Sequence, residues 1–207
     1  MTEGLTLVAA VVAAYLLGSF PAGYLLGRLW GVNVLSCGSG RTGGTNVLRS
    51  AGIVPALLTG LLDIGKGALA VWVAGQMTGY PEVEVLAGAA AILGHNYSVF
   101  LRFRGGAGVG TSLGALGAIY LPAALGLVVM LLVTIAVTRY ASLGSLIVST
   151  LMPLVLLVLG LEGILPLTYV AYGVLAWIII VYAHRPNIQR LLQGTERRIG
   201  EGGQPIS

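Results

Sequence analysis

The chain has 207 residues, of which 57% are hydrophobic and 9% are charged, and its formal net charge is +4 at pH 7. So little charge excludes a soluble domain of this size, and a mean hydropathy of +0.93 is typical of a polytopic membrane protein. The single cysteine, Cys37, excludes an intrachain disulfide and a cysteine-based metal site. We therefore expect one all-α membrane domain over 1–207, with no metal, no other cofactor and no nucleic-acid partner.

The apolar segments predict about seven transmembrane helices, some of them short. An apolar core of about 30 Å needs about 20 helical residues per crossing. The charge-free segment 105–138 is too long for one crossing, so we expect two short helices broken near Tyr120 and Pro122. The other crossings are expected at 4–27, 50–80, 83–101, 141–160 and 163–183. The start of the second crossing is open, because 46–60 would also suit an interfacial segment.

The positions of the charges predict the orientation, because lysine and arginine near the ends of spans stay on the cytoplasmic side. The connections that contain Glu82, Glu84 and Glu162 carry no lysine or arginine, so they should face outward. The N-terminus is then expected outside and the tail 184–207 in the cytoplasm. The polar segments whose side chains could bind or react with a substrate are all expected on that cytoplasmic side: 36–49, 94–111, 139–145 and 184–196. Their convergence predicts a site that faces the cytoplasm.

The segment 94–111 reads GHNYSVFLRFRGGAGVGT and is the first site candidate. Gly105, Gly106 and Gly108 would let backbone N–H groups converge on an anion, and Arg102 and Arg104 add positive charge beside them. The implied ligand is a phosphate or another small oxyanion. Gly106 and Gly110, like Gly110 and Gly114, also have GxxxG spacing, which usually marks close helix packing, so both interpretations stay open.

The segment 36–49, SCGSGRTGGTNVLR, is the second candidate. Ser39, Thr45 and Asn46 offer hydroxyl and amide groups, and Arg49 can bind a phosphate through two parallel N–H bonds. A turn followed by a helix cap explains the same residues equally well. Neither glycine-rich segment matches the Walker pattern or a GxGxxG opening a strand–helix unit, which argues against nucleotide hydrolysis.

Ionisable residues inside the apolar segments are further candidates. Asp63 and Lys66 share one helix face, and such a pair marks either a functional site or a salt bridge between helices; we favour the salt bridge. His95 has Phe100 where a catalytic His-x4-Asp pair would need an aspartate, so it is either a substrate ligand or an interfacial histidine.

The last two polar segments, RYASLGS and HRPNIQRLLQGTE, contribute hydroxyl, imidazole and amide groups. Ser142 is either a helix cap or a substrate ligand. His184 and Asn187 suit a polar substrate, whereas the arginines of the tail are interpreted as contacts to anionic headgroups.

Five motifs, in this order and spacing, resemble those of the bacterial acyl-phosphate-dependent glycerol-3-phosphate acyltransferase family, PlsY: GSGRTGGTNVLR, LLDIGKG, GHNYSVFLRFRGGAGVGTSLG, RYASLGS and HRPNIQRLLQGTE. The likeness covers about residues 5–196. It implies a multi-pass enzyme of the bacterial inner membrane. Such an enzyme transfers a fatty acyl group from acyl phosphate to the sn-1 hydroxyl of glycerol-3-phosphate, giving lysophosphatidic acid for phospholipid biosynthesis. The implied partners are these substrates, the bilayer and the soluble enzyme that makes acyl phosphate.

The resemblance also implies site residues. Those that match the family motifs are Ser39, Asn46, Arg49, His95, Gly105, Gly106, Gly108, Thr111, Ser142, His184, Asn187 and Glu196. His184 is the candidate catalytic proton acceptor, with the substrate phosphate as the alternative. Glu196 is expected to support the site together with Asp63 and Lys66, and the remaining residues are expected to bind substrate.

Two positions depart from the family pattern. The family usually reads GSGNPGATN and FKGGKGVAT, whereas this chain has Arg41 in place of an asparagine and Ala107 in place of a phosphate-contacting lysine. We hypothesise that Arg41 restores the missing charge from another direction, and Arg104 is a second candidate for this role. The alternatives are a diverged paralogue with another acceptor and a small transporter of an anionic metabolite, which would use Asp63 and Lys66 at a midplane site.

Overall fold

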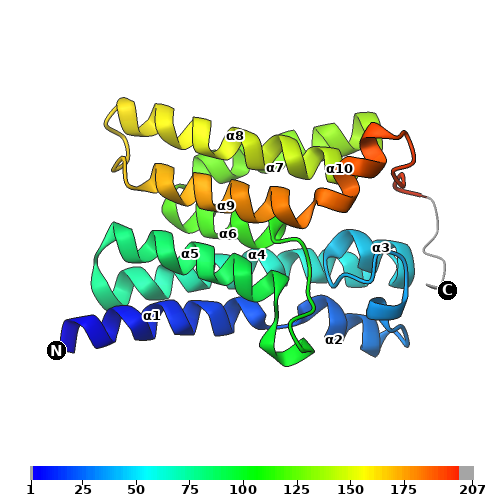
Figure 1. The fold of residues 1–207 in the computed structure, drawn as a ribbon, viewed down its shortest axis with the longest axis horizontal. Coiled ribbons are helices and arrows are strands. Elements are labelled where there is room, and N and C mark those ends of the chain that lie inside the picture. Colours follow the sequence, from blue (N-terminus) through cyan, green and yellow to red (C-terminus); the bar gives the residue numbers. More distant parts are fainter. Residues whose placement is uncertain (1, 201–207) are drawn as a thin grey trace.

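A computed structural model describes residues 2–200, so the last seven residues of the expected tail lie outside the described residues. Within this range the chain is a bundle of helices that run roughly along one long axis (Figure 1). The elements are α1 (Thr2–Ser19), α2 (Ala22–Leu29), η1 (Val34–Ser36), α3 (Gly44–Ala51), α4 (Ile53–Thr78), α5 (Pro81–Asn96), η2 (Val99–Leu101), α6 (Val109–Ile119), α7 (Leu121–Thr138), α8 (Ala141–Leu161), α9 (Tyr169–Ala183) and α10 (Arg185–Leu192).

The expected all-α polytopic membrane fold is confirmed. In the described part of the chain, five helical stretches are long and apolar enough to cross a membrane: Glu3–Leu29, Ile53–Thr78, Pro81–Leu101, Leu121–Thr138 and Ala141–Leu161. Two further apolar helices, α6 and α9, are shorter, with 11 and 15 residues. Together they correspond to the seven expected crossings. The break near Tyr120 is also present, because Tyr120 is extended between α6 and α7 and Pro122 lies in the first turn of α7.

The first expected crossing, 4–27, is divided into α1 and α2. Pro21 has no backbone N–H and separates the two helices. Because the helix is interrupted here, the Phe20 carbonyl oxygen can accept a hydrogen bond from Lys66 Nζ, at 2.9 Å. An intramembrane lysine therefore stabilises the interruption, which hydropathy alone does not reveal.

The structure decides one boundary that the sequence left open and corrects one that it placed too early. The second crossing does not start at Ser50: α3 ends at Ala51, Gly52 takes a positive φ of 95°, and α4 begins at Ile53. The last crossing starts at Tyr169 instead of 163, because Gly163 has a φ of 69° and a turn follows it. In both cases no charged residue lies between the glycine and the next helix, so hydropathy does not show the boundary. The positive φ of the glycine marks it instead.

Small residues bring α1, α4 and α5 close together. Their shared core consists mainly of alanines, among them Ala14, Ala74 and Ala91. A Cβ on Gly18 would lie 2.1 Å from the Ala91 carbonyl oxygen, so the backbones of α1 and α5 are in direct contact there. A second core surrounds Tyr172 of α9, whose hydroxyl donates to Ser112 O at 2.7 Å. α1 is therefore packed backbone to backbone on α5, and α9 is joined to α6 by a hydrogen bond.

Charged residues are segregated between the two ends of the bundle. The start of α1, the α4–α5 turn and the α8–α9 turn lie at one end, where Glu3, Glu82, Glu84 and Glu162 occur. Helices α3 and α10 and the polar loops lie toward the opposite end (Figure 1). Which end faces the cytoplasm stays a prediction from the positive-inside rule.

Candidate active site

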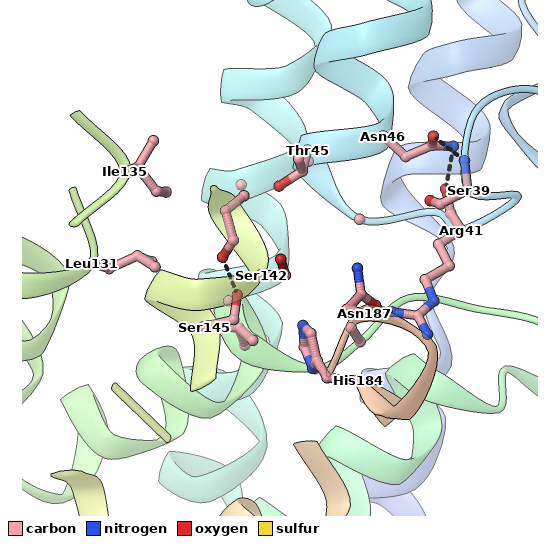
Figure 2. Close-up of a pocket in the computed structure, with 18 of the residues that line it drawn as sticks. Ser39, Arg41, Thr45, Asn46, Leu131, Ile135, Ser142, Ser145, His184 and Asn187 are labelled. Carbon is pink, nitrogen blue, oxygen red and sulfur yellow. Dashed lines mark hydrogen bonds between the residues drawn. The ribbon is translucent and has the colours of Figure 1, made fainter. Parts of the chain in front are cut away.

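A cavity of about 220 Å³ opens among the α3, α4, α6, α7, α8 and α10 helices. It lies toward the end of the bundle that carries α3, α10 and the polar loops. Figure 2 shows side chains from the first polar loop facing those of α8 and the α9–α10 junction across this space. Most of the residues expected from the sequence line it: Ser39, Arg41, Asn46, Arg49, Asp63, His95, Gly108, Ser142, His184, Asn187 and Glu196. The structure thus brings together four segments that are far apart in the chain.

Five expected residues do not line the cavity. Arg104 is exposed, and Thr111 and Lys66 are buried within the helix bundle. Gly105 and Gly106 also do not line the cavity and pack against His95 and Asn96 at the end of α5. The Gly106 N–H donates to His95 O at 3.0 Å, so this amide is already used within the protein and the expected nest of free N–H groups is incomplete. A Cβ at Gly106 would lie 2.0 Å from His95 Nε2, which explains the glycine by packing.

Asn46 holds the first polar loop in shape. Its Nδ2 group lies 2.9, 3.1 and 2.8 Å from the carbonyl oxygens of Val34, Cys37 and Arg41, and its Oδ1 accepts from Ser39 N at 2.8 Å. The residue is only 3% exposed. All its polar atoms are therefore occupied by the loop, and the geometry makes Asn46 a residue that positions Ser39 and Arg41.

Arg41 bridges this loop to the end of α9. Its Nη2 donates to the Ala183 carbonyl oxygen and its Nη1 approaches Asn187 Oδ1 at 3.4 Å. A helix C-terminus is a favourable place for a cation because its last carbonyls point outward. Burial lowers the pKa of Arg41, the nearby Arg190 lowers this pKa further, and Glu196 opposes the change. Arginine nevertheless stays charged at neutral pH.

Glu196 joins α8 to α10. Its Oε1 accepts from Ser142 Oγ at 3.0 Å and from Asn187 Nδ2 at 2.8 Å, and its Oε2 accepts from Arg190 Nε at 2.7 Å. The Asn187 amide is thereby oriented, with its oxygen toward Arg41 and its nitrogen toward Glu196. The carboxylate is buried, as expected of a residue that supports a site.

His184 has a defined tautomer. Its Nδ1 lies 2.8 Å from the Ile180 carbonyl oxygen, which can only accept, so Nδ1 carries the proton and Nε2 is the unprotonated nitrogen of the neutral ring. Burial lowers the pKa of His184, the Ile180 bond opposes this shift, and Arg41 lowers the pKa further. His184 is therefore neutral at pH 7, with Nε2 able to accept a proton.

Asp63 and Lys66 form an ion pair, with 2.9 Å between Nζ and Oδ1, but both lie on α4, so the pair does not join two helices as expected. His95 Nδ1 also lies 3.3 Å from Asp63 Oδ1. His95 thus has a carboxylate partner, but this partner comes from α4. A search for an acid downstream of His95 could not find it, because the two residues meet only through the packing of α4 on α5.

Arg190 and Arg197 correct the headgroup interpretation of the tail arginines, because both line the cavity. Arg190 pairs with Glu196, and the backbone carbonyl of Arg197 accepts from Arg49 Nη2 at 3.0 Å. The spacing of Asn187 and Arg190, three positions apart on α10, was a sequence signal that the two side chains share a helix face. Thr45 and Ser145 also line the cavity.

The cavity wall combines a cationic region with an apolar one. The ionisable residues that line it are four arginines, two carboxylates and two histidines. The positive excess favours an anion with more than one negative charge. Opposite this region, Leu131 and Ile135 of α7 supply an apolar wall.

Fold and site define a multi-pass helical membrane protein with a cavity suited to a phosphorylated molecule that also carries an apolar group. A family model described as glycerol-3-phosphate acyltransferase matches residues 8–194. A glycerol-3-phosphate acyltransferase of Synechococcus sp. (strain CC9902) is 45% identical over 191 residues, which cover 92% of this chain and 94% of the relative. One of Thermus thermophilus is 46% identical over 195 residues, covering 92% and 94%. The chain belongs to the glycerol-3-phosphate acyltransferase family.

Two crystal structures of PlsY, an integral membrane glycerol 3-phosphate acyltransferase, have the same fold. The glycerol 3-phosphate form has a TM-score of 0.85 at 36% identity, and covers 94% of this chain and 96% of that chain. The lysophosphatidic acid form has a TM-score of 0.83 at 35% identity, with the same coverage. The resemblance inferred from the five motifs is confirmed. Membership in a family of acyltransferases leaves the transporter interpretation without support.

Proposed function

We propose that this chain transfers a fatty acyl group from acyl phosphate to the sn-1 hydroxyl of glycerol-3-phosphate in the bacterial cytoplasmic membrane. The products are lysophosphatidic acid and inorganic phosphate, and the cavity faces the cytoplasm. The observation that carries this proposal is the combination of four arginines with an apolar wall in one cavity. Both substrates bear phosphate, and the donor also bears an acyl chain. The glycerol 3-phosphate and lysophosphatidic acid forms of PlsY support the acceptor and the product.

In this proposal the acceptor binds against α3, α8 and α10. Arg49 contacts the phosphate of glycerol-3-phosphate, since its guanidinium suits bidentate binding. Ser39, Ser142 and Asn187 bind the glycerol hydroxyls, and Glu196 keeps Ser142 and Asn187 in place through its two hydrogen bonds to them.

The donor binds with its phosphate at the start of α6 and its chain along α7. Ala107 and Gly108 line the cavity directly before α6 begins at Val109, and an α-helix N-terminus favours an anion. Arg41 supplies a guanidinium in the same cavity. The acyl chain extends past Leu131 and Ile135 toward the lipid, which matches its apolar character.

Acyl phosphate is already activated, so positioning and charge stabilisation are the main tasks of the enzyme. The sn-1 oxygen of glycerol-3-phosphate forms a bond to the acyl carbonyl carbon. The bond from that carbon to the phosphate oxygen breaks, and phosphate leaves with the electron pair. The hydroxyl proton passes to His184 Nε2 or to the substrate phosphate. Supply of the donor by a soluble enzyme that makes acyl phosphate fits a cavity open to the cytoplasm.

The test uses purified protein in lipid or detergent with palmitoyl phosphate and labelled glycerol-3-phosphate. Lysophosphatidic acid and phosphate should appear in equal amounts. Palmitoyl-CoA and palmitoyl acyl carrier protein are tested in parallel, and product from these thioesters alone would refute the acyl-phosphate donor. Arg49→Gln should abolish most activity, whereas Arg185→Gln, on α10 but outside the cavity, should retain it.

A further inference from the structure

The segment 98–104, called the hook below, is an exposed projection that the proposed reaction does not use. It follows α5, and the candidate membrane span that contains α5 ends at Leu101. Figure 1 shows it beside the junction of α1 and α2. Phe100 and Phe103 are 60% and 63% exposed, and the side chains of Arg102 and Arg104 are exposed next to them. Two aromatic rings and two guanidiniums therefore share a short stretch at the end of a span.

The hook has a defined but strained backbone. Arg102 and Phe103 both adopt left-handed conformations, with φ of 54° and 60°. Residues with a Cβ rarely do so, and consecutive ones persist only when neighbouring contacts enforce them. Phe103 N donates to Ser98 O at 2.8 Å, and Ser98 Oγ donates to Ser19 O at 2.6 Å. The hook is thus fastened to the end of α1, and its shape keeps both phenylalanines exposed.

The two arginines of the hook have no anionic partner among the described residues. The ion pairs in residues 2–200 involve Asp63 and Glu196, and both carboxylates are buried in the bundle. No acidic residue occurs in the sequence between Glu84 and Glu162, and the turns beside which these two lie, α4–α5 and α8–α9, are at the end of the bundle where α1 begins. An anion that neutralises Arg102 and Arg104 must therefore come from outside these residues.

We propose that the hook lies in the membrane–water interface and binds the headgroups of anionic phospholipids. Phenylalanine suits the apolar side of an interfacial segment, and each arginine near an anionic leaflet adds to the attraction. Phe100 and Phe103 enter the boundary of the acyl chains, and Arg102 and Arg104 contact the lipid phosphates. Gly105 follows Arg104 directly and begins the glycine-rich segment that lines the cavity at Ala107 and Gly108.

A position-specific quenching experiment tests this proposal. Val99→Cys in a Cys37→Ser background is labelled with a nitrobenzoxadiazole fluorophore, and the full-length protein is placed in phosphatidylcholine nanodiscs. Small amounts of phosphatidylglycerol or phosphatidylcholine, each spin-labelled near the headgroup, are then added. Phosphatidylglycerol should quench at least about threefold more strongly than phosphatidylcholine, and high salt should reduce the difference, since the attraction is electrostatic.

Matched variants separate lipid binding from a structural effect. Arg102→Gln/Arg104→Gln should bring the quenching ratio close to one, whereas Arg102→Lys/Arg104→Lys and Arg185→Gln should keep it. Equal quenching by the two lipids, when the labelled protein keeps Arg102 and Arg104, would overturn the proposal. A preference for phosphatidylglycerol that survives the double glutamine substitution would also overturn it. Stronger quenching by aqueous iodide than by either lipid would also overturn it, because the hook would then lie in water.

Discussion

Arg41 provides the sharpest test of how this chain binds a donor phosphate without a lysine at position 107. Arg41→Asn removes a guanidinium that lines the cavity and contacts Ala183 O and Asn187. A hydrogen bond to a charged group contributes about 1.5 to 3 kcal/mol. Loss of such a bond to the donor phosphate should therefore lower kcat/KM for acyl phosphate by about 10- to 150-fold.

The assay measures KM and kcat for palmitoyl phosphate and for glycerol-3-phosphate separately, together with the thermal midpoint of each variant. Arg41→Lys keeps the charge but loses the fork of donors, so it should recover only part of the activity. Ala107→Lys places a cation at the other candidate position and should give a smaller gain than the loss caused by Arg41→Asn. The KM for acyl phosphate should change more than that for glycerol-3-phosphate.

The compensation hypothesis is refuted by a large gain from Ala107→Lys together with no effect of Arg41→Asn. A second contrary outcome is a fall in the thermal midpoint of Arg41→Asn that accounts for the whole loss of activity. In that case Arg41 would serve only to bridge the loop to α9 through its contacts with Ala183 and Asn187.

Three further predictions concern His184, Gly106 and Glu196. If neutral His184 accepts the proton, kcat should rise with pH as the imidazolium is lost, with a midpoint below 6.5 because burial lowers its pKa; an acid limb unchanged in His184→Ala would exclude this role. Gly106→Ala should abolish acyltransferase activity measured in membranes, because the new Cβ would lie 2.0 Å from His95 Nε2. Gly126→Ala is the matched control and should be tolerated, because a Cβ there would have no neighbouring atom within 4 Å. Glu196→Ala should lower the thermal midpoint by about 5 to 10 °C, since it leaves Arg190 without its partner, and a shift no larger than that of Arg185→Ala would contradict the support role.

Local features of the sequence were sufficient to locate the apolar helices and one ion pair, but not to place every helix boundary. The interruption at Tyr120 follows from Pro122 and from the length of the uncharged segment, both of which are contiguous in the chain. The Asp63–Lys66 pair follows from the three-residue spacing that places two side chains on one helix face. Glycine-dependent boundaries such as Gly52 and Gly163 were missed, because a positive φ leaves no trace in hydropathy.

Contacts between distant segments were decided by the tertiary structure. The sequence indicated that Asn46, His95 and Glu196 belong to the site, but not that Asn46 fixes its own loop. Nor did it indicate that Asp63 is the partner of His95, or that Glu196 orients Asn187. Spacing along one helix determines which side chains share its face, whereas a partner on another helix depends on the register and crossing angle of two packed surfaces. Those quantities are set jointly by all the residues at the interface, among them the small residues that let α1, α4 and α5 approach so closely.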